Sequence, residues 1–246
     1  MKRTFLLVAA LMMLAALPSF AQNIQFHYDF GSQIYRSEQK DLSTRPALTT
    51  TVEMFRPDDW GSTFFFVDMN YGSLHRDNQG GVLGAYWEIA RELKFWKAPV
   101  SIHVEYNGGL EISKAAATVY NDAWLGGVTY SYASPDFTKT FSISAMYKAI
   151  PRNESPHNFQ LTGVWNIWFY HNAFLFCGFI DFWREKRPWQ GTEYIILSEP
   201  QFWYNFNSIK GLEKFNFSIG TEVEISNNFA GKGFYAIPTA AVKWTF

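Results

Sequence analysis

Apolar and polar residues alternate with a period of two in one segment after another along this chain. In residues 215–226, one side carries Phe215, Phe217, Ile219, Thr221, Val223 and Ile225, and the other carries Asn216, Ser218, Gly220, Glu222, Glu224 and Ser226. Successive side chains of a β-strand point to opposite faces, so this period predicts strands. A tilted strand that crosses a membrane needs about nine to eleven residues, which is the length of these segments.

Turn-forming residues and polar stretches divide the chain into predicted strands of this kind. We expect strands near residues 23–35, 47–56, 62–72, 81–94, 100–110, 121–133, 140–150, 157–169, 173–184, 192–205, 214–226 and 233–246. The pattern predicts an all-β fold: a transmembrane antiparallel up-and-down β-barrel of about 12 strands, with residues 22–246 as one domain. An even count puts both chain ends on one side, the periplasmic side in a bacterial barrel.

The connections fall into two classes. Tight turns are predicted at 57–61, 97–99, 134–136 and 171–172, and longer polar loops at 36–46, 73–80, 111–120, 151–156, 185–191 and 227–232. Two segments leave an alternative open. Residues 162–183 are apolar enough for a membrane helix, although Asn166, His171 and Asp181 would be costly in a lone span. Residues 88–96 fit a short helix or a strand, and we favour strands in both places.

Composition supports a membrane barrel. Aromatic residues make up 19% of the chain and charged residues 17%, against about 25% charged in an ordinary soluble domain. Mean hydropathy is nevertheless −0.15, which fits strands that have one apolar and one polar face. The net charge of −1 argues against nucleic acid as a partner. A single cysteine, Cys177, excludes an internal disulfide.

Both chain ends carry signals for export and insertion. Residues 1–21 combine Lys2 and Arg3, an apolar run and a small-residue end at Ala21, so we expect a cleaved signal peptide. An uncleaved anchor is disfavoured, since the apolar run is short for a membrane span. The last predicted strand ends in Phe246, an aromatic end of the kind that the barrel-insertion machinery reads. We expect a protein of the bacterial outer membrane, surrounded by its lipid.

Alternation places many carboxylates inside the predicted barrel. The inward acids are Asp29, Glu53, Asp68, Glu88, Glu105, Glu199, Glu222 and Glu224, whereas the inward bases are fewer: Lys148, Lys243, His27 and His103. Carboxylates in a pore favour cations, so an acidic wall would admit cations and neutral polar solutes. We take as candidate pore-lining residues Asp29, Glu53, Phe66, Asp68, Tyr86, Glu88, His103, Glu105, Glu199 and Glu222. The alternative is that these groups pair and fill the lumen.

Enzymatic signatures are weak. None of the five histidines adjoins a recognisable serine motif, no zinc spacing or phosphate loop occurs, and we expect neither a metal nor a cofactor. The predicted function is passive passage of small polar solutes. The alternatives are a plugged structural or adhesive barrel and, behind it, a lipid-modifying barrel enzyme.

Residues 48–68, LTTTVEMFRPDDWGSTFFFVD, have a strand with a central Glu, an Asp-Asp-Trp turn and an aromatic strand that ends in Asp. This stretch resembles the nucleoside-specific Tsx-type channels of the outer membrane, and residues 81–94 resemble the next strand of that family. The similarity covers about fifty residues, and elsewhere only strand number and loop order agree. It implies a monomeric twelve-stranded barrel with a narrow pore for nucleosides.

Overall fold

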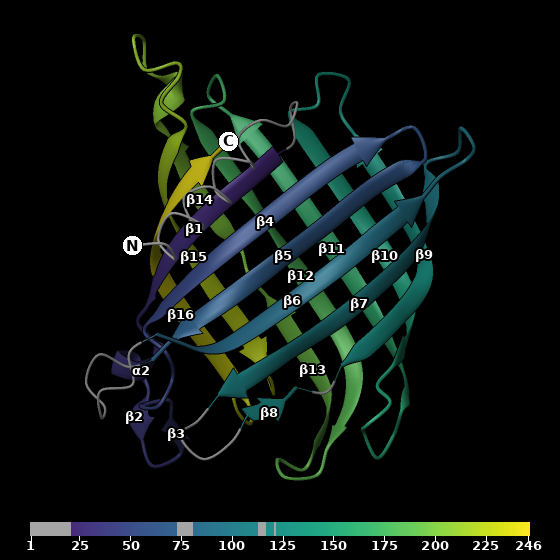
Figure 1. Cartoon of the computed structure of the whole chain (residues 1–246), viewed down its shortest axis with the longest axis vertical. Coiled ribbons are helices and arrows are strands. Elements are labelled where there is room, and N and C mark those ends of the chain that lie inside the picture. Colours follow the sequence, from purple (N-terminus) through teal and green to yellow (C-terminus); the bar gives the residue numbers. More distant parts are fainter. Residues whose placement is uncertain (1–20, 73–80, 113–116, 121) are drawn as a thin grey trace, which may run out of the picture.

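The computed structural model describes residues 21–72, 81–112, 117–120 and 122–246. Its main sheet is a closed antiparallel barrel (Figure 1). The wall strands are β1 (Ala21–Asp29), β4 (Leu48–Asp58), β5 (Gly61–Tyr71), β6 (Val82–Leu93), β7 (Val100–Ile112), β9 (Ala123–Ala133), β10 (Lys139–Ala149), β11 (His157–Phe169), β12 (Phe174–Arg187), β13 (Thr192–Ser198) continued by β14 (Gln201–Asn205), β15 (Phe217–Asn227) and β16 (Phe234–Thr245).

The wall therefore has twelve strands when β13 and β14, separated only by Glu199 and Pro200, are counted as one. Four short elements lie in the connections: α2 (Gly31–Ile34), the hairpin β2 (Arg36–Ser37) and β3 (Lys40–Asp41), and η1 (Phe206–Ser208). A fifth, β8 (Ala117–Val119), extends β7 at one rim. The predicted all-β barrel is confirmed. Residues 1–20 of the predicted signal peptide and the loop at 73–80 lie outside the described residues, whereas Ala21 begins β1.

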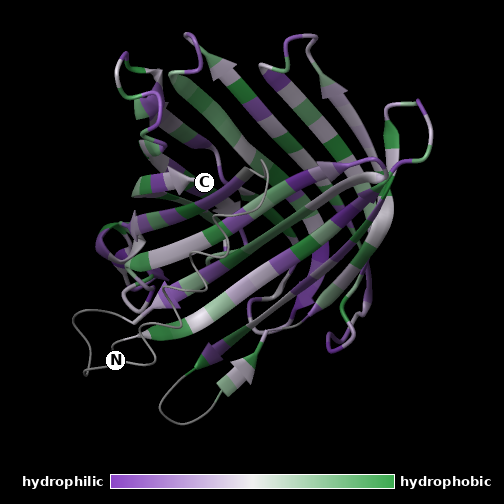
Figure 2. Ribbon diagram, turned by 45° about the horizontal axis from the view of Figure 1, so that its top comes forward, coloured by the Kyte–Doolittle hydropathy of each residue, from purple (hydrophilic) through white to green (hydrophobic). Residues whose placement is uncertain are grey.

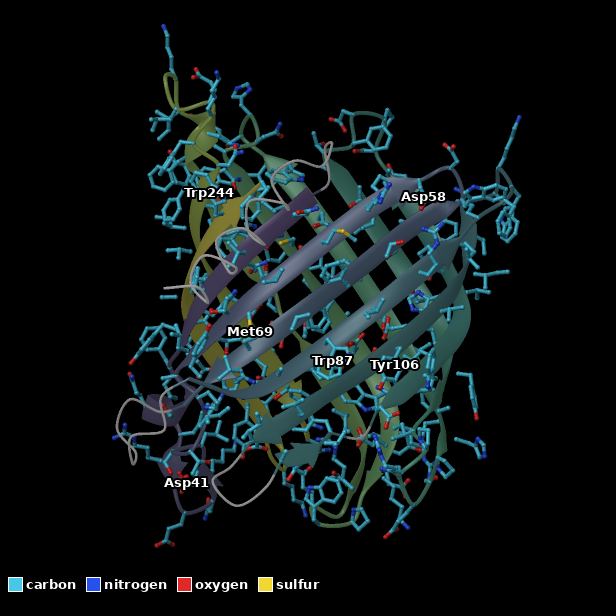
Figure 3. All side chains as sticks on the ribbon, in the orientation of Figure 1. Asp41, Asp58, Met69, Trp87, Tyr106 and Trp244 are labelled. Atoms are coloured by element: carbon cyan, nitrogen blue, oxygen red, sulfur yellow. The ribbon has the colours of Figure 1, made fainter. Side chains whose placement is uncertain are left out.

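Each wall strand pairs with its neighbours in sequence, and β1 closes the barrel on β16. Asn23 pairs with Thr245, so the first and last strands place both chain ends at one rim, as predicted. Asp58, at the short β4–β5 turn, lies at this rim, and Asp41 of the first loop lies at the opposite one (Figure 3). Following the sequence expectation, we call these the periplasmic and the outer rim.

The alternation seen in the sequence becomes an outer apolar face and an inner polar face. On β10, Ile143 is 66% exposed on the outside, whereas Ser144 and Met146 are 5% and 4% exposed on the inside. Apolar and polar bands alternate along the strands (Figure 2). An uncovered belt of this kind is stable where hydrocarbon surrounds it. No helix within the described ranges has the length and apolar character for crossing a membrane.

Both segments with a helical alternative form strands. Residues 162–183 fold into the β11–β12 hairpin, whose turn holds Tyr170, His171 and Asn172 at φ of 51°, 55° and 61°. Residues 88–93 belong to β6, and Arg91 points outward close to the periplasmic rim, where it binds Asp58 at 2.6 Å and 2.8 Å. A charge on the outer face is tolerated near the interface.

The first strand is shorter than predicted, ending at Asp29 instead of residue 35. Asp29 Oδ1 accepts the Gly31 amide at 2.6 Å, which turns the chain into α2. A Cβ on Gly31 would lie 2.8 Å from Asp29 Oδ1 and 2.9 Å from Ile237, so only glycine fits this corner. Strand periodicity in the sequence does not register such a local side-chain-to-backbone contact.

β1 ends before the end of β16, and the remaining backbone groups of β16 are hydrogen-bonded by residues 30–47, which we call the first loop. The Phe30 amide donates to the Pro238 carbonyl at 3.2 Å. Tyr35 Oη donates to the Ala236 carbonyl at 3.1 Å and accepts the Ala236 amide at 2.9 Å. Lys40 Nζ donates to the carbonyl of the first residue of β16. The backbone edge beyond the end of β1 is thus satisfied by a loop instead of a strand.

Pro238 interrupts the β15–β16 ladder without producing a bulge. Pairing stops between Gly220 and Val223 and resumes in the same register. Thr239 fills the gap, since its Oγ1 accepts the Glu222 amide at 3.1 Å and its carbonyl accepts Thr221 Oγ1 at 2.6 Å. These side-chain hydrogen bonds bridge the interruption next to Pro238, which has no N–H to donate to the ladder.

Candidate functional site: the barrel lumen

The ten candidate pore-lining residues all lie on the inner side of the barrel wall. Asp29, His103 and Glu105 are 6%, 6% and 8% exposed. The others are half-buried: Glu53, Phe66, Asp68, Tyr86, Glu88, Glu199 and Glu222. Because no strand covers the inner face, partial exposure there means that these side chains border the lumen. Asp181 lies in the middle of β12, opposite Thr162 and Leu197.

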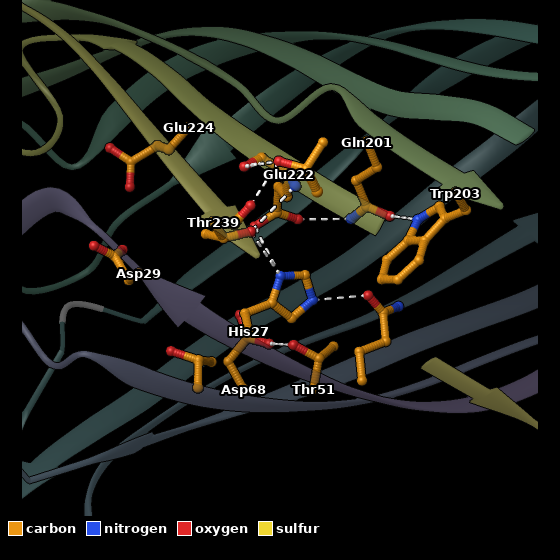
Figure 4. Close-up of polar contacts among 12 residues, drawn as sticks. His27, Asp29, Thr51, Asp68, Gln201, Trp203, Glu222, Glu224 and Thr239 are labelled. Atoms are coloured by element: carbon orange, nitrogen blue, oxygen red, sulfur yellow. Dashed lines mark hydrogen bonds and ion pairs between the residues drawn. The ribbon is translucent and has the colours of Figure 1, made fainter. Parts of the chain in front are cut away.

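One wall of the lumen, formed by β1, β14, β15 and β16, carries a connected polar network (Figure 4). His27 Nε2 lies 2.9 Å from Gln25 Oε1, and His27 Nδ1 lies 3.3 Å from Thr239 Oγ1. On β14, Gln201 Nε2 donates to Glu222 Oε2 at 2.6 Å, and its Oε1 accepts from Trp203 at 2.8 Å. Alternate residues of neighbouring strands bring these groups together on one face.

The opposite wall holds the residues that we call the β7 cluster: Glu88, Glu92, His103, Glu105 and Asn107. His103 bridges two carboxylates, with Nδ1 2.6 Å from Glu92 Oε1 and Nε2 3.0 Å from Glu105 Oε2. Glu88 Oε1 accepts from Asn107 Nδ2 at 3.1 Å. The sequence pattern places Glu92 inward but gave no sign that it would share a histidine with Glu105.

Three aromatic rings form a ladder beside the β7 cluster. Phe64 and Phe66 have ring centroids 6.0 Å apart, and Phe66 and Tyr86 5.9 Å apart. Tyr86 Oη donates to Glu88 at 2.6 Å, which links the ladder to the cluster. The lumen therefore offers aromatic faces and carboxylates side by side, as the sequence predicted.

On the remaining wall, formed by β9 to β12, side chains on the inner face pack against one another. Lys148 Nζ donates to Gln160 at 2.6 Å and lies 4.7 Å above the Trp183 ring, and on β16 Lys243 lies 4.0 Å above Trp203. Trp183 and Trp203 are 5% and 0% exposed. Both rings are therefore buried within the wall instead of bordering the lumen, and each is covered by a lysine ammonium group.

Arg45 of the first loop enters the outer mouth of the lumen, a contact that strand periodicity does not reveal. Its Nε donates to Asp29 Oδ2 at 2.7 Å and its Nη2 to Glu224 Oε2 at 2.6 Å. We call this group the Arg45 bridge. Burial alone would lower the pKa of Arg45, but the Glu224 and Asp29 carboxylates outweigh it and raise that pKa above its usual value. The bridge ties the first loop to β1 and β15.

Polar groups on the inner face contact one another in pairs and small networks. In the described ranges, no group of three or more His, Cys, Asp or Glu side chains is placed to hold a metal ion. Ser101 Oγ donates to Glu92, while both His103 nitrogens contact carboxylates. The histidine is therefore not positioned to activate that hydroxyl as a nucleophile. Carboxylates remain in excess of basic side chains on the inner face.

The fold is similar to that of a porin of known structure. The NanC porin is 10% identical, with 92% of this chain and 100% of that chain covered and a TM-score of 0.55. The channel DcaP of Acinetobacter baumannii (9% identity, 93% and 96% covered, TM-score 0.43) and LpxR from Salmonella typhimurium (8%, 93% and 100%, 0.46) match more loosely. At these identities, only the NanC similarity bears on the fold, and none assigns a substrate.

No curated protein sequence matches the chain significantly. Membership of the nucleoside-specific Tsx-type channels stays a prediction from the residues quoted above. A family model, described as a domain of unknown function (DUF5020), matches residues 21–246, the whole of the described barrel. The chain belongs to this DUF5020 family.

Proposed function

We propose that this protein is an outer-membrane channel for the passive uptake of small polar solutes. Export by the predicted signal peptide and insertion through the Phe246 end would deliver it to the bacterial outer membrane. The observation that carries the proposal is the inner face: half-buried Glu53, Asp68, Glu88 and Glu222 border the lumen in a barrel whose outer face is apolar. A polar lumen inside an apolar belt is the arrangement of a membrane channel.

The charge of the lumen supports a preference for cations and neutral polar solutes. Carboxylates come from β1, β4, β5, β6, β7 and β15, which are contiguous around the closed barrel together with β16. Such a surface attracts cations and repels anions. The ladder of Phe64, Phe66 and Tyr86 adds flat apolar faces, and stacking on an aromatic ring contributes about 1–3 kcal/mol per base. Nucleosides, which the Tsx-type resemblance implies, combine a flat base with a polar sugar.

Conductance and liposome swelling test the channel. Purified protein in a planar bilayer should give stable conductance with a reversal potential that indicates cation preference in a salt gradient. The double variant Glu88→Gln with Glu105→Gln should reduce that preference, while Glu193→Gln, at an exposed outer-rim carboxylate, should leave it unchanged. Liposomes should swell faster in nucleosides than in sugars or amino acids of similar size. If purified protein gave no conductance and no liposome swelling, the channel would be contradicted. Swelling without a preference for nucleosides would contradict only the substrate class.

A plugged structural barrel is the second candidate, and a specific observation favours it. The Arg45 bridge lies at the outer mouth, where it joins β1 to β15, and Lys148 and Lys243 are stacked on buried tryptophans. If these contacts fill the lumen, the protein would conduct no ions. It would still show the heat-modifiable migration on gels that a channel also shows. Single-channel recording separates the two candidates directly.

A further inference from the structure

Two oxygen atoms of the β7 cluster have no hydrogen-bond partner within the described part of the chain. They are Glu105 Oε1 and Asn107 Oδ1, and both are buried. Their residues are 8% and 4% exposed. A buried polar atom without a partner costs roughly 1–3 kcal/mol, and more when charged. Such atoms in a folded protein call for an explanation, which includes a ligand that supplies the missing donor.

The orientation of both groups is fixed by their other contacts. Asn107 Nδ2 donates to Glu88 Oε1 at 3.1 Å, so turning the amide over would set oxygen against carboxylate oxygen. Glu105 Oε2 is bound to His103 Nε2 at 3.0 Å, which leaves Oε1 as its free acceptor. The two residues are two apart on β7, so their side chains leave the same face. What is missing at this place is a donor.

The charge around the two oxygens favours a cationic donor over a neutral one. The charges of Glu105 and of Asp181, on β12, both act on Glu88, and Lys148 opposes them. His103, which contacts Glu92 and Glu105, is the basic group within the cluster, so three glutamates share one histidine there. Glu88 keeps partial exposure to the lumen, and a solute approaching from the lumen meets it first. A primary ammonium group carries a positive charge and three N–H donors.

Strand register sets aromatic rings next to these acceptors. Phe66 pairs with Glu88, which pairs with Asn107, and in the adjacent row Phe64 pairs with the small Ala90, which pairs with Glu105. The ladder thus runs alongside the cluster on one continuous inner face. Aromatic faces attract organic cations and pack against their apolar parts.

We propose that the inner face of β5, β6 and β7 binds a primary organic amine: its ammonium donates to Glu105 Oε1 and Asn107 Oδ1 beside Glu88, and its body lies against the Phe64–Phe66–Tyr86 ladder. The proposal deepens the proposed channel function, on which it rests for the access of solute to the lumen. The proposal assigns the cation preference of the channel to the inner face of β5, β6 and β7, and it names primary organic amines as the solutes bound there.

Calorimetry with the purified, folded barrel tests the site independently of transport. The probes are 2-phenylethylammonium, neutral 2-phenylethanol, and trimethyl(2-phenylethyl)ammonium, which has the charge without an N–H donor. The first should bind, and the other two should bind at least about tenfold more weakly, because losing a hydrogen bond to a charged group costs that much. Equal binding of all three probes overturns the assignment, and so does no binding of the first.

Variants locate the site, and heat-modifiable migration confirms that each one is folded. Glu105→Gln should raise the Kd of 2-phenylethylammonium about tenfold or more. Glu193→Gln, which removes an exposed carboxylate at the outer rim, is the matched control and should leave that Kd unchanged. In a further measurement, Na⁺ or K⁺ is exchanged for choline at constant ionic strength while binding of 2-phenylethylammonium is followed. If Na⁺ or K⁺ displaced the amine, the two oxygens would be assigned to an alkali ion and the amine proposal would be overturned. Amine binding without conductance would retain this site and reject the channel.

Discussion

Replacing Arg45 by methionine should destabilise the barrel by removing the positive partner that two buried carboxylates share in the Arg45 bridge. Asp29 and Glu224 have side chains 8% and 6% exposed, and each receives one short hydrogen bond from Arg45, at 2.7 Å and 2.6 Å. Removing one partner of a buried ion pair costs about 3–5 kcal/mol. Because the Arg45 side chain is itself 26% exposed, water offsets part of this, and we expect about 3 kcal/mol.

Guanidinium unfolding in detergent micelles, followed by tryptophan fluorescence, measures this loss. The matched control is Arg36→Met in the same loop. The Arg36 guanidinium is exposed and donates to the Ser32 carbonyl, so its loss should change stability by less than about 0.5 kcal/mol. Adding Asp29→Asn and Glu224→Gln to the Arg45 variant removes the uncompensated charges and should restore most of the loss. Equal stability of the Arg45 and Arg36 variants, or no recovery in the triple variant, would refute the reasoning.

Three further predictions concern the wall. Gly127→Ala should lower the free energy of unfolding by about 1–3 kcal/mol through overpacking, since its Cβ would lie 2.1 Å from a carbonyl of β10. Gly126→Ala, with open space around it, is the control and should leave stability unchanged in the same unfolding assay. Ile143→Arg, on the exposed centre of β10, should lower the free energy of unfolding in lipid vesicles by about 2–4 kcal/mol. A negligible loss of stability would show that this face does not lie in hydrocarbon. Gly178 has φ 145°, and a Cβ there would lie 2.4 Å from the Glu199 carbonyl oxygen, so Gly178→Ala should lower the temperature at which the folded band on a gel converts to the unfolded band. An unchanged temperature would show that the β13–β14 interruption does not need glycine.

The sequence predicts most of the wall because one rule governs it. Each strand alternates between lipid and lumen, so inward residues such as Glu88 and Glu105 can be read one strand at a time. Contacts that depend on two or more strands are out of reach of that rule. The sharing of His103 between Glu92 and Glu105 requires the β6–β7 register, and periodicity alone leaves that register open.

Loops obey no period, and there the prediction fails for a different reason. Arg45 and Glu224 are 179 residues apart, and their meeting depends on the path of the first loop after Asp29 turns the chain. A polar loop residue with a long side chain is ordinarily solvated. Only the backbone geometry, with an unpaired β16 edge to be covered, shows why this loop folds against the barrel.

That unpaired edge has a consequence for the order of folding. β1 and β16 share seven paired positions, against eleven between β4 and β5, and they join the two ends of the chain. Pairings so distant in sequence carry the largest loop-closure entropy and form late. Tyr35 can reach Ala236 only when β16 has arrived, so closure and loop docking form one final event. Until then the sheet would carry two bare edges, which makes this last step the moment at which the chain is most exposed to aggregation.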